Sequence, residues 1–242
     1  MRRRSQLLLF ALVLAATPLA AQVTFDAQSD ITDVLTSVNN TTTLAHTTAV
    51  ATNRILLVAS HLNLRNATGT TVTSITYGGQ PLTLLDAITD AAPDTRTEVW
   101  YLLNPPTGAN NVILTAGGIT PGQNVESVLS ATTFNGVTQL APPSNTNSGQ
   151  NDPATVALTG TTTNDLVVDF ISARESVTLT PDFQVQGYNT STGTTNDDVQ
   201  ASVSGRAGVA GTTTMSWDVS ANRRWSIVGV QLSPAQADIE VT

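Results

Sequence analysis

The sequence predicts an all-β fold, an antiparallel β-sandwich that is jelly-roll-like. Threonine, valine and leucine are frequent and charged residues make up only 12% of the chain, which favours strands with neutral polar faces over amphipathic helices. Several segments alternate apolar and polar residues with the period of two that is typical of strands. Glycine-containing turns, for example at 78–79, 121–122 and 135–136, separate these segments at short intervals, as in sandwiches and jelly rolls.

Residues 1–21 have the three-part order of a cleavable signal peptide. Three arginines at 2–4 precede an apolar run at 7–16, and the small residues Ala20 and Ala21 end the segment. The run is shorter than the roughly 20 residues that span a bilayer, so we expect no membrane segment in the mature chain. The segment lacks the full apolar pair of a twin-arginine signal. We therefore expect general secretion, cleavage after Ala21, and a secreted or cell-surface location.

The mature chain, residues 22–242, is expected to form a single sandwich domain without disulfides. The sequence contains no cysteine, so burial and sheet hydrogen bonds must supply its stability. Of the ten basic residues three lie in the signal segment, and with 18 acidic residues the mature chain has a formal charge of −11. A surface of this charge repels phosphate backbones, so we expect no nucleic-acid partner.

The strands can be placed in chain order. A first strand is predicted at 23–26, and 30–38 has the apolar spacing of a short helix behind Asp30 as N-cap, with a loop as the alternative. The segment 54–64 is apolar on both faces, which predicts a central strand. Strict alternation at 212–219 places Trp217 on the inward face and Thr214 on the outward face. Further strands are predicted at 42–47, 72–77, 82–85, 98–103, 112–115, 125–134, 154–158, 166–173, 183–187, 199–203 and 225–232.

Two features concern the organisation of the chain. Residues 141–153 are rich in Pro, Asn, Ser and Gly, and we interpret them as a long loop across one sandwich, because neither flank offers an obviously closed set of strands. The segments 53–58 (NRILLV), 164–168 (NDLVV) and 222–228 (NRRWSIV) each place a turn asparagine and a charged residue before an apolar strand. This echo is the signature of an internal duplication, or simply of buried strands that begin with a polar turn.

A set of segments resembles a known class of module. They are NRILLV (53–58), SITYGGQPL (74–82), EVWYLLNPP (98–106), NDLVVD (164–169) and the final strand at 225–232. Together they resemble a recurrent β-sandwich module of bacterial secreted and cell-surface proteins, and the resemblance covers nearly the whole mature chain. It implies an adhesin-like or anchored setting. It implies no established activity, cofactor or catalytic residue.

Few residues suggest chemistry. His46 and His61 belong to no metal-binding pair, and the sequence contains no serine-hydrolase elbow. His61 shares a strand face with apolar residues, so we interpret it as a hydrogen-bonded core or rim residue. Glu98 and Asp169 lie in apolar strands, where a raised pKa would suit the acid of a glycosidase.

Three further features can be interpreted either as functional or as purely structural. The favoured alternative for Glu98 and Asp169 is a buried partner such as Arg54 or Arg174, or a strand face that is open to solvent. Asp197 and Asp198, after Asn196, are candidate calcium ligands, but the run lacks the ligand order of an EF-hand and solvated carboxylates are the favoured interpretation. Tyr188 lies in the polar stretch 187–198 and is the candidate ligand-stacking ring, whereas the other aromatic residues alternate with apolar residues as core residues do.

These observations predict a secreted, non-enzymatic module that binds an extracellular glycan or surface protein. One alternative is a polysaccharide hydrolase that uses two carboxylates. The other is a structural subunit that assembles through its strand-like tail, 237–242 (ADIEVT). We expect no cofactor for the preferred function, apart from the candidate calcium site.

Overall fold

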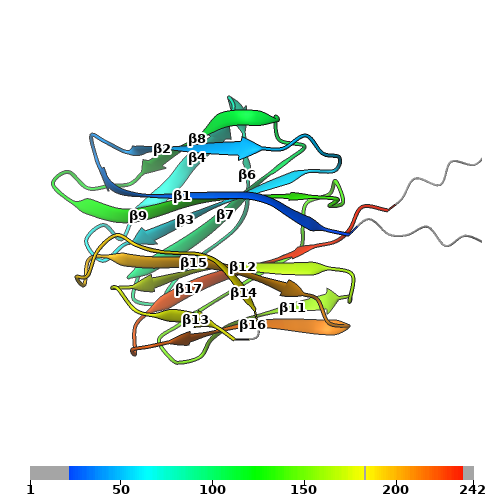
Figure 1. Ribbon diagram of the computed structural model, residues 1–242. Coiled ribbons are helices and arrows are strands. Elements are labelled where there is room, and N and C mark those ends of the chain that lie inside the picture. The colour runs from blue at the N-terminus through cyan, green and yellow to red at the C-terminus, as the bar shows by residue number, and fades with distance from the viewer. Residues whose placement is uncertain (1–21, 183, 237–242) are drawn as a thin grey trace, which may run out of the picture.

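The computed structural model describes residues 22–182 and 184–236, which form 17 strands in four antiparallel sheets. The sheets stack as four layers, two from each half of the chain (Figure 1). This confirms the prediction of an all-β fold with sandwich-like pairs of sheets. In the part of the chain that is described, no helix has the length and apolar character needed to cross a membrane. The predicted signal segment, with Ala21, and the tail 237–242 lie outside the described residues.

The first half of the chain forms two of the four layers. Its strands are β1 (Thr24–Thr36), β2 (Thr41–Thr48), β3 (Ile55–Asn63), β4 (Thr71–Tyr77), β5 (Gln80–Pro81), β6 (Thr83–Thr89), β7 (Thr95–Leu103), β8 (Gly108–Gly117) and β9 (Asn124–Asn135). The inner N-terminal sheet, which faces the other half, has the order β1-β9-β3-β7-β6. The outer N-terminal sheet has the order β2-β8-β4-β5.

The second half repeats this arrangement on the other side. Its strands are β10 (Ser144–Gly149), β11 (Ala154–Thr161), β12 (Leu166–Arg174), β13 (Leu179–Pro181), β14 (Val185–Ser191), β15 (Val199–Ala207), β16 (Gly211–Val219) and β17 (Trp225–Leu232). The inner C-terminal sheet has the order β10-β17-β12-β15-β14, and the outer C-terminal sheet has the order β11-β16-β13.

Apart from β5, every strand of the first half has a counterpart in the second half. β10, β17, β12, β15 and β14 occupy the places of β1, β9, β3, β7 and β6, and β11, β16 and β13 occupy those of β2, β8 and β4. The echoing segments 53–58 and 164–168 lead into β3 and β12, the central strands of the inner sheets. The third echo, 222–228, leads into β17, which corresponds to β9. The topology therefore supports an internal duplication for the first two segments and not for the third.

Apolar side chains fill the three spaces between the four sheets. From β3, Leu56 and Leu62 face the outer N-terminal sheet, while Ile55 and Leu57 face the inner C-terminal sheet. Trp217 is buried in the third core, between the two C-terminal sheets. The prediction that 54–64 is a central strand with two apolar faces is confirmed. Its physical reason is that an inner sheet of this stack has no face toward solvent.

Two sequence predictions are wrong because outer strands take their conformation from the strand that pairs with them. The segment at 30–38 is neither a short helix nor a loop: as far as Thr36 it belongs to β1, which pairs with β9 along nearly its whole length. Residues 141–153 are not one continuous loop, since they contain β10, which pairs with β17. In both cases a neighbouring strand supplies hydrogen bonds that the local sequence pattern does not reveal.

Candidate functional site

A chain of buried hydrogen bonds crosses the boundary between the two inner sheets. His61 on β3 lies at its centre: its Nδ1 is 2.9 Å from the Ser172 hydroxyl of β12, and its Nε2 is 2.5 Å from the Tyr188 hydroxyl of β14. Ser130 on β9 donates to the Tyr188 hydroxyl at 2.9 Å, and the Thr97 hydroxyl of β7 is 2.6 Å from that of Ser172. All five residues are buried. We call this set the inter-sheet hydroxyl chain.

The protons in this chain can be assigned from its donors. Because the Tyr188 hydroxyl accepts from Ser130, it donates its own proton to His61 Nε2, and Nδ1–H then donates to Ser172. Burial lowers the pKa of His61 to about 3, so the ring is neutral at physiological pH. The prediction that His61 is a hydrogen-bonded core residue is confirmed. Ser172 lies far away in the sequence, so no local signal could have identified it as a partner.

Tyr188 is not an exposed ring, contrary to the expectation from its polar surroundings. Its side chain is only 5% exposed, and its ring packs edge-on against that of His61 with centroids 5.8 Å apart. The flanking residues Gly187 and Asn189 are exposed, because successive residues of a strand point to opposite faces. A buried ring offers no face on which a sugar could stack.

His46 also lies beside a serine, at the side of the N-terminal half. Its Nδ1 is 3.1 Å from the Ser29 hydroxyl of β1 and its Nε2 is 2.7 Å from the Thr133 hydroxyl of β9. Burial lowers the pKa of His46, although the charge of Asp26 acts to raise it. Both nitrogens of each histidine are thus engaged by protein hydroxyls. Ser172 beside His61 is fully buried, whereas Ser29 beside His46 is half-buried.

Glu98 is a buried carboxylate in the core of the N-terminal half. It is 1% exposed and accepts hydrogen bonds at both oxygens. Its Oε1 accepts from Arg96 Nε at 2.7 Å and from the Val72 N–H at 3.0 Å, and its Oε2 accepts from the Trp100 indole at 3.1 Å. This carboxylate therefore connects the inner strand β7 to β4 of the outer sheet.

The cation beside Glu98 is not one of the two that the sequence suggested. Arg54 donates to the backbone carbonyl of Pro105, and Arg174 belongs to a separate ion-pair cluster described below. The partner is Arg96, two residues before Glu98 on β7. Residues i and i+2 of a strand share a face, so this spacing was the signal that could have found the pair.

Asp169 is a buried carboxylate in the core of the C-terminal half. Its Oδ1 accepts from the Ser204 hydroxyl at 2.5 Å and from the Ser204 N–H at 3.2 Å, and its Oδ2 accepts from the Trp217 indole at 2.6 Å. Burial raises the pKa of Asp169 to about 7, against the effect of these hydrogen bonds. Asp169 and Glu98 face different cores, so they do not flank one sugar bond as the carboxylates of a glycosidase do.

A group of ion-paired side chains lies where β17 begins, at the opposite end of that strand from residue 236. Arg174 Nη1 is 2.7 Å from Asp94 Oδ2, and Arg174 Nη2 is 3.4 Å from Glu175 Oε1. Arg223 Nε is 2.5 Å from Glu175 Oε2, and Arg224 Nε is 3.7 Å from Asp94 Oδ2. We call these five residues the charged end cluster. Asp94 precedes β7, so the cluster joins loops from both halves of the chain.

Glu175 has an unusual backbone within this cluster. Its φ is 68°, in the left-handed region that residues other than glycine adopt at a cost. Its N–H donates to the Asp198 carbonyl at 2.9 Å, and its carboxylate is held by Arg174 and Arg223. The neighbouring loops thus fix Glu175 in a conformation that its own sequence does not favour.

Asp197 and Asp198 belong to the loop beside this cluster. Asp198 accepts from the Thr195 hydroxyl at 2.7 Å and from the Thr192 hydroxyl at 3.0 Å. Burial acts to raise the pKa of Asp198, but the hydrogen bonds from Thr195 and Thr192 outweigh it and lower the pKa. Asp197 pairs with Arg65 at 3.4 Å on the surface. Within residues 22–182 and 184–236, no group of three His, Asp or Glu side chains is arranged to hold a metal ion.

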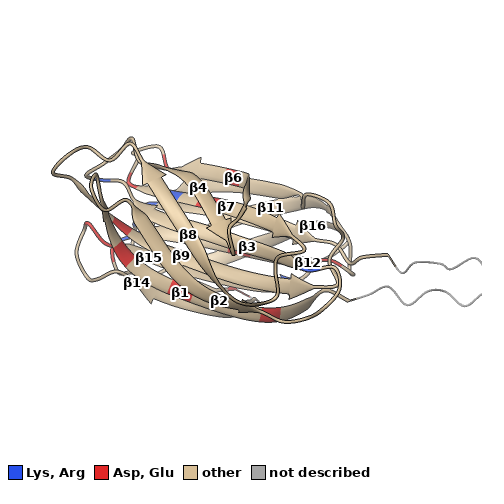
Figure 2. Ribbon diagram, turned by 90° about the horizontal axis from the view of Figure 1, so that it is seen from above, with Lys and Arg blue, Asp and Glu red and all other residues tan. Residues whose placement is uncertain are grey.

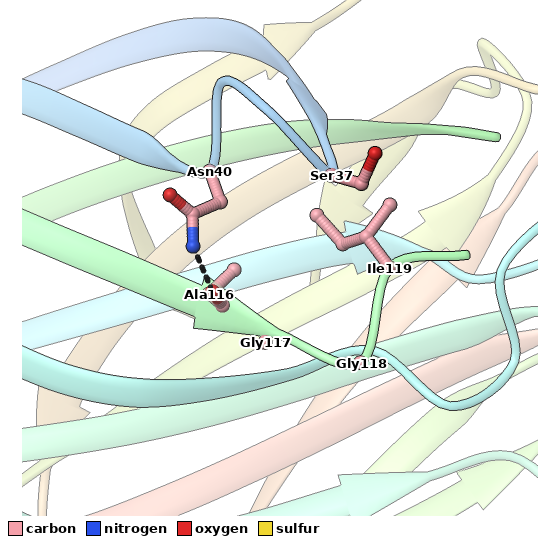
Figure 3. A pocket seen from close by; sticks show the side chains of 6 residues that line it. All are labelled: Ser37, Asn40, Ala116, Gly117, Gly118 and Ile119. Atoms are coloured by element: carbon pink, nitrogen blue, oxygen red, sulfur yellow. Dashed lines mark hydrogen bonds between the residues drawn. The ribbon is translucent and has the colours of Figure 1, made fainter. Parts of the chain in front are cut away.

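A small pocket lies where the turn after β1 meets the end of β8 (Figure 3). Its volume is about 90 Å³ and its lining includes Ser37, Asn40 and Ile119. The Asn40 amide donates to the Ala116 carbonyl at 2.7 Å across its floor. Pockets for small-molecule ligands usually have volumes of about 300 to 1,000 Å³, so this one has room for water and little else.

The outer N-terminal sheet presents a broad uncharged face. Its strands β2, β4 and β8 contain no Asp, Glu or Arg, and Figure 2, which looks down on this face, shows them without charge colours. The charged residues that the structure describes lie instead on the other strands and in the loops, including the charged end cluster.

Comparison with known proteins gives no assignment. No family model matches the chain, and no curated protein matches it in sequence. The fold and the buried networks described above are therefore the basis for any statement about function.

Proposed function

We propose that this protein is an exported, non-catalytic β-sandwich module that binds an extracellular glycan or surface protein through the charged end cluster. The observation that carries the proposal is that three partly exposed arginines of the second half meet the more buried Glu175 and, from the first half, Asp94, at the end where β17 begins. Loops at one end of a sandwich commonly form its binding surface.

The chemistry of the cluster suits recognition. The Arg174, Arg223 and Arg224 side chains are 22%, 35% and 29% exposed, so each is partly accessible from solvent. Arginine is enriched among the residues that dominate binding energies. It also donates to sugar hydroxyls and carboxylates in a fixed fork geometry. The strained backbone at Glu175 supports the same proposal, because such strain concentrates at functional sites.

The non-catalytic part of the proposal rests on the state of the chemically capable side chains. His61, Glu98 and Asp169 are all buried in hydrogen-bond networks that leave no room for a substrate. Export is supported by the order of residues 1–21 and by the resemblance to modules of secreted and surface proteins. Each half of the chain is a pair of packed antiparallel sheets, and sandwiches of this kind often serve recognition.

The test is a binding screen of the mature chain against glycans and matrix proteins, followed by titration of each hit. An Arg223→Ala/Arg224→Ala variant should bind at least tenfold more weakly, about the loss expected for a central arginine. Arg206→Ala is the matched control, because Arg206 is a partly exposed arginine on β15 outside the cluster. Hits whose affinity is unchanged in the double variant would place the binding surface elsewhere.

A further inference from the structure

The outer strands of the inner sheets have unpaired backbone groups, and side chains of this fold form hydrogen bonds to some of them. An outer strand presents a row of backbone N–H and C=O groups to which a strand of another molecule can pair. β10 is such a strand, since it pairs only with β17, and the next strand in the chain, β11, pairs only with β16. β10 and β11 lie next to each other at the side of the C-terminal half. Their outward edges therefore form one surface.

Two asparagines of β10 occupy the backbone groups of this surface. Asn145 Oδ1 accepts from the N–H of the next residue, Thr146, at 3.0 Å, while Asn145 Nδ2 donates to the Ala157 carbonyl of β11 at 2.8 Å. Asn147, two residues further along β10, makes the same two kinds of hydrogen bond. Its Oδ1 accepts from the next N–H at 2.9 Å and its Nδ2 donates to the Thr155 carbonyl at 2.7 Å.

The same device recurs on two other outer strands. Asp33 on β1 accepts from the next N–H at 2.8 Å and from the Thr42 hydroxyl of β2 at 2.7 Å. Asp86 on β6 accepts from the next N–H at 2.9 Å and from the Ser144 hydroxyl of β10 at 2.9 Å. In each case the side chain of an Asp or Asn accepts a hydrogen bond from the N–H of the next residue in its own strand. The same side chain also forms a hydrogen bond to the outer strand of a neighbouring sheet.

β10 depends on this device more than the others do. Bulges interrupt the pairing of β1, β6 and β14, and a bulge bends an outer strand so that a partner cannot align with it. β10 pairs with β17 in unbroken register from Ser144 to Gly149. It also contains no charged residue, so it lacks the charge that protects other outer strands.

We propose that Asn145 and Asn147 form a clip that closes the β10–β11 edge against strand addition by a second copy of this chain. The clip lies on the side of the stack and not in the charged end cluster, so it does not depend on the proposed binding function. Opening the clip frees two N–H groups on the regular, uncharged strand β10 and two C=O groups on β11 beside it. The partner that fits such an edge best is the same edge of another copy, paired antiparallel about a twofold axis.

The experiment compares the mature chain with an Asn145→Thr/Asn147→Thr variant by size-exclusion chromatography with light scattering over a range of concentrations. Threonine keeps the strand polar and favours β structure, but it is too short to bridge to β11. We expect the mass of the variant to at least double at concentrations where the wild type keeps its lower mass. Asn111→Thr is the matched control, because Asn111 is exposed on β8, which is paired on both sides, and it should behave as wild type.

The mass of a second variant and the hydrogen exchange of two wild-type amides also test the clip. An Asn145→Asp/Asn147→Asp variant retains the N–H acceptors and adds charge to the edge, so it should keep the lower mass. In the wild type the amides of Thr146 and Ser148 should exchange with solvent at least tenfold more slowly than exposed loop amides, a result that does not require any variant to fold. A folded threonine variant with the mass of the wild type at every concentration would overturn the proposal. Fast exchange of both wild-type amides would also overturn it.

Discussion

Replacing Trp217 by phenylalanine tests the buried Asp169 network directly. Trp217 is fully buried and its indole N–H donates to Asp169 Oδ2 at 2.6 Å. Phenylalanine keeps a buried aromatic ring but removes this donor and part of the indole. The cost of the change therefore measures the hydrogen bond together with a small cavity. It should depend on whether Asp169 is charged.

The sign of the pH dependence follows from the pKa of Asp169. Burial raises this pKa from 3.8 to about 7 in the folded chain, so the folded state holds the proton more tightly than the unfolded state. The contribution of Asp169 to stability is then highest below about pH 4 and falls as the pH rises toward 7. A hydrogen bond to a charged acceptor contributes about 1.5 to 3 kcal/mol, and one to a neutral acceptor about 0.5 to 1.5 kcal/mol. Trp217→Phe should therefore cost more free energy of unfolding at pH 9 than at pH 5.

The assay is urea denaturation followed by circular dichroism at pH 5 and pH 9. Comparing variant and wild type at the same pH cancels the opposite contribution of His61, whose pKa is lowered to about 3 and whose stabilising effect is lost as the pH falls below about 6.5. Thr214→Ala, on the exposed face of the same strand, should stay within about 0.5 kcal/mol at both pH values. Trp217→Ala should cost about 3 to 5 kcal/mol. An equal cost of Trp217→Phe at pH 5 and pH 9 would refute the assignment of Asp169 as a group that ionises in the folded core.

Three further predictions concern other parts of the molecule. Tyr188→Phe removes the donor to His61 Nε2 and should cost about 1 to 3 kcal/mol in urea melts, because a buried acceptor is left without a partner; a neutral effect would contradict the inter-sheet hydroxyl chain. Glu98→Gln should lower the free energy of unfolding by about 1.5 to 3 kcal/mol. If the wild type turns over a polysaccharide, this variant should do so as well, and a folded variant that loses the turnover would support the hydrolase alternative. Expression in a Gram-negative host should yield an exported chain that begins at or near Gln22, and N-terminal sequencing that found Met1 intact would contradict the signal peptide.

The strongest sequence patterns predicted their strands well. Residues 225–232 were predicted with the bounds that β17 has, and the alternation at 212–219 placed Trp217 inward and Thr214 outward, as they are in β16. These strands bury one or both faces, so the positions of their apolar residues show which face is buried. Residues 30–36 of β1 have the apolar spacing of a helix and β10 is polar throughout. Neither shows the alternation of a strand, because each outer strand owes its conformation to the strand beside it.

The site shows the same division. His61 could be recognised as a core histidine from its apolar neighbours on β3, and Glu98 could be expected to have a buried partner. The hydrogen-bond partners of His61 could not be predicted from the sequence, since Ser172 and Tyr188 come from the other half of the chain. Tyr188 was misjudged because its neighbours in the sequence are polar, whereas its own side of β14 faces the inner N-terminal sheet.

The sequence by itself determined the class of fold, the absence of disulfides, the acidic charge, and which residues alternate between the faces of the well-patterned strands. Only the tertiary structure decided that the two pairs of sheets stack through their inner faces, which buries His61 with Ser172 and places Glu98 and Asp169 in separate cores. The physical reason is that alternation specifies which face of a strand leaves water but not what covers it. A buried polar group takes its partners from whichever distant strands that packing brings within hydrogen-bond distance.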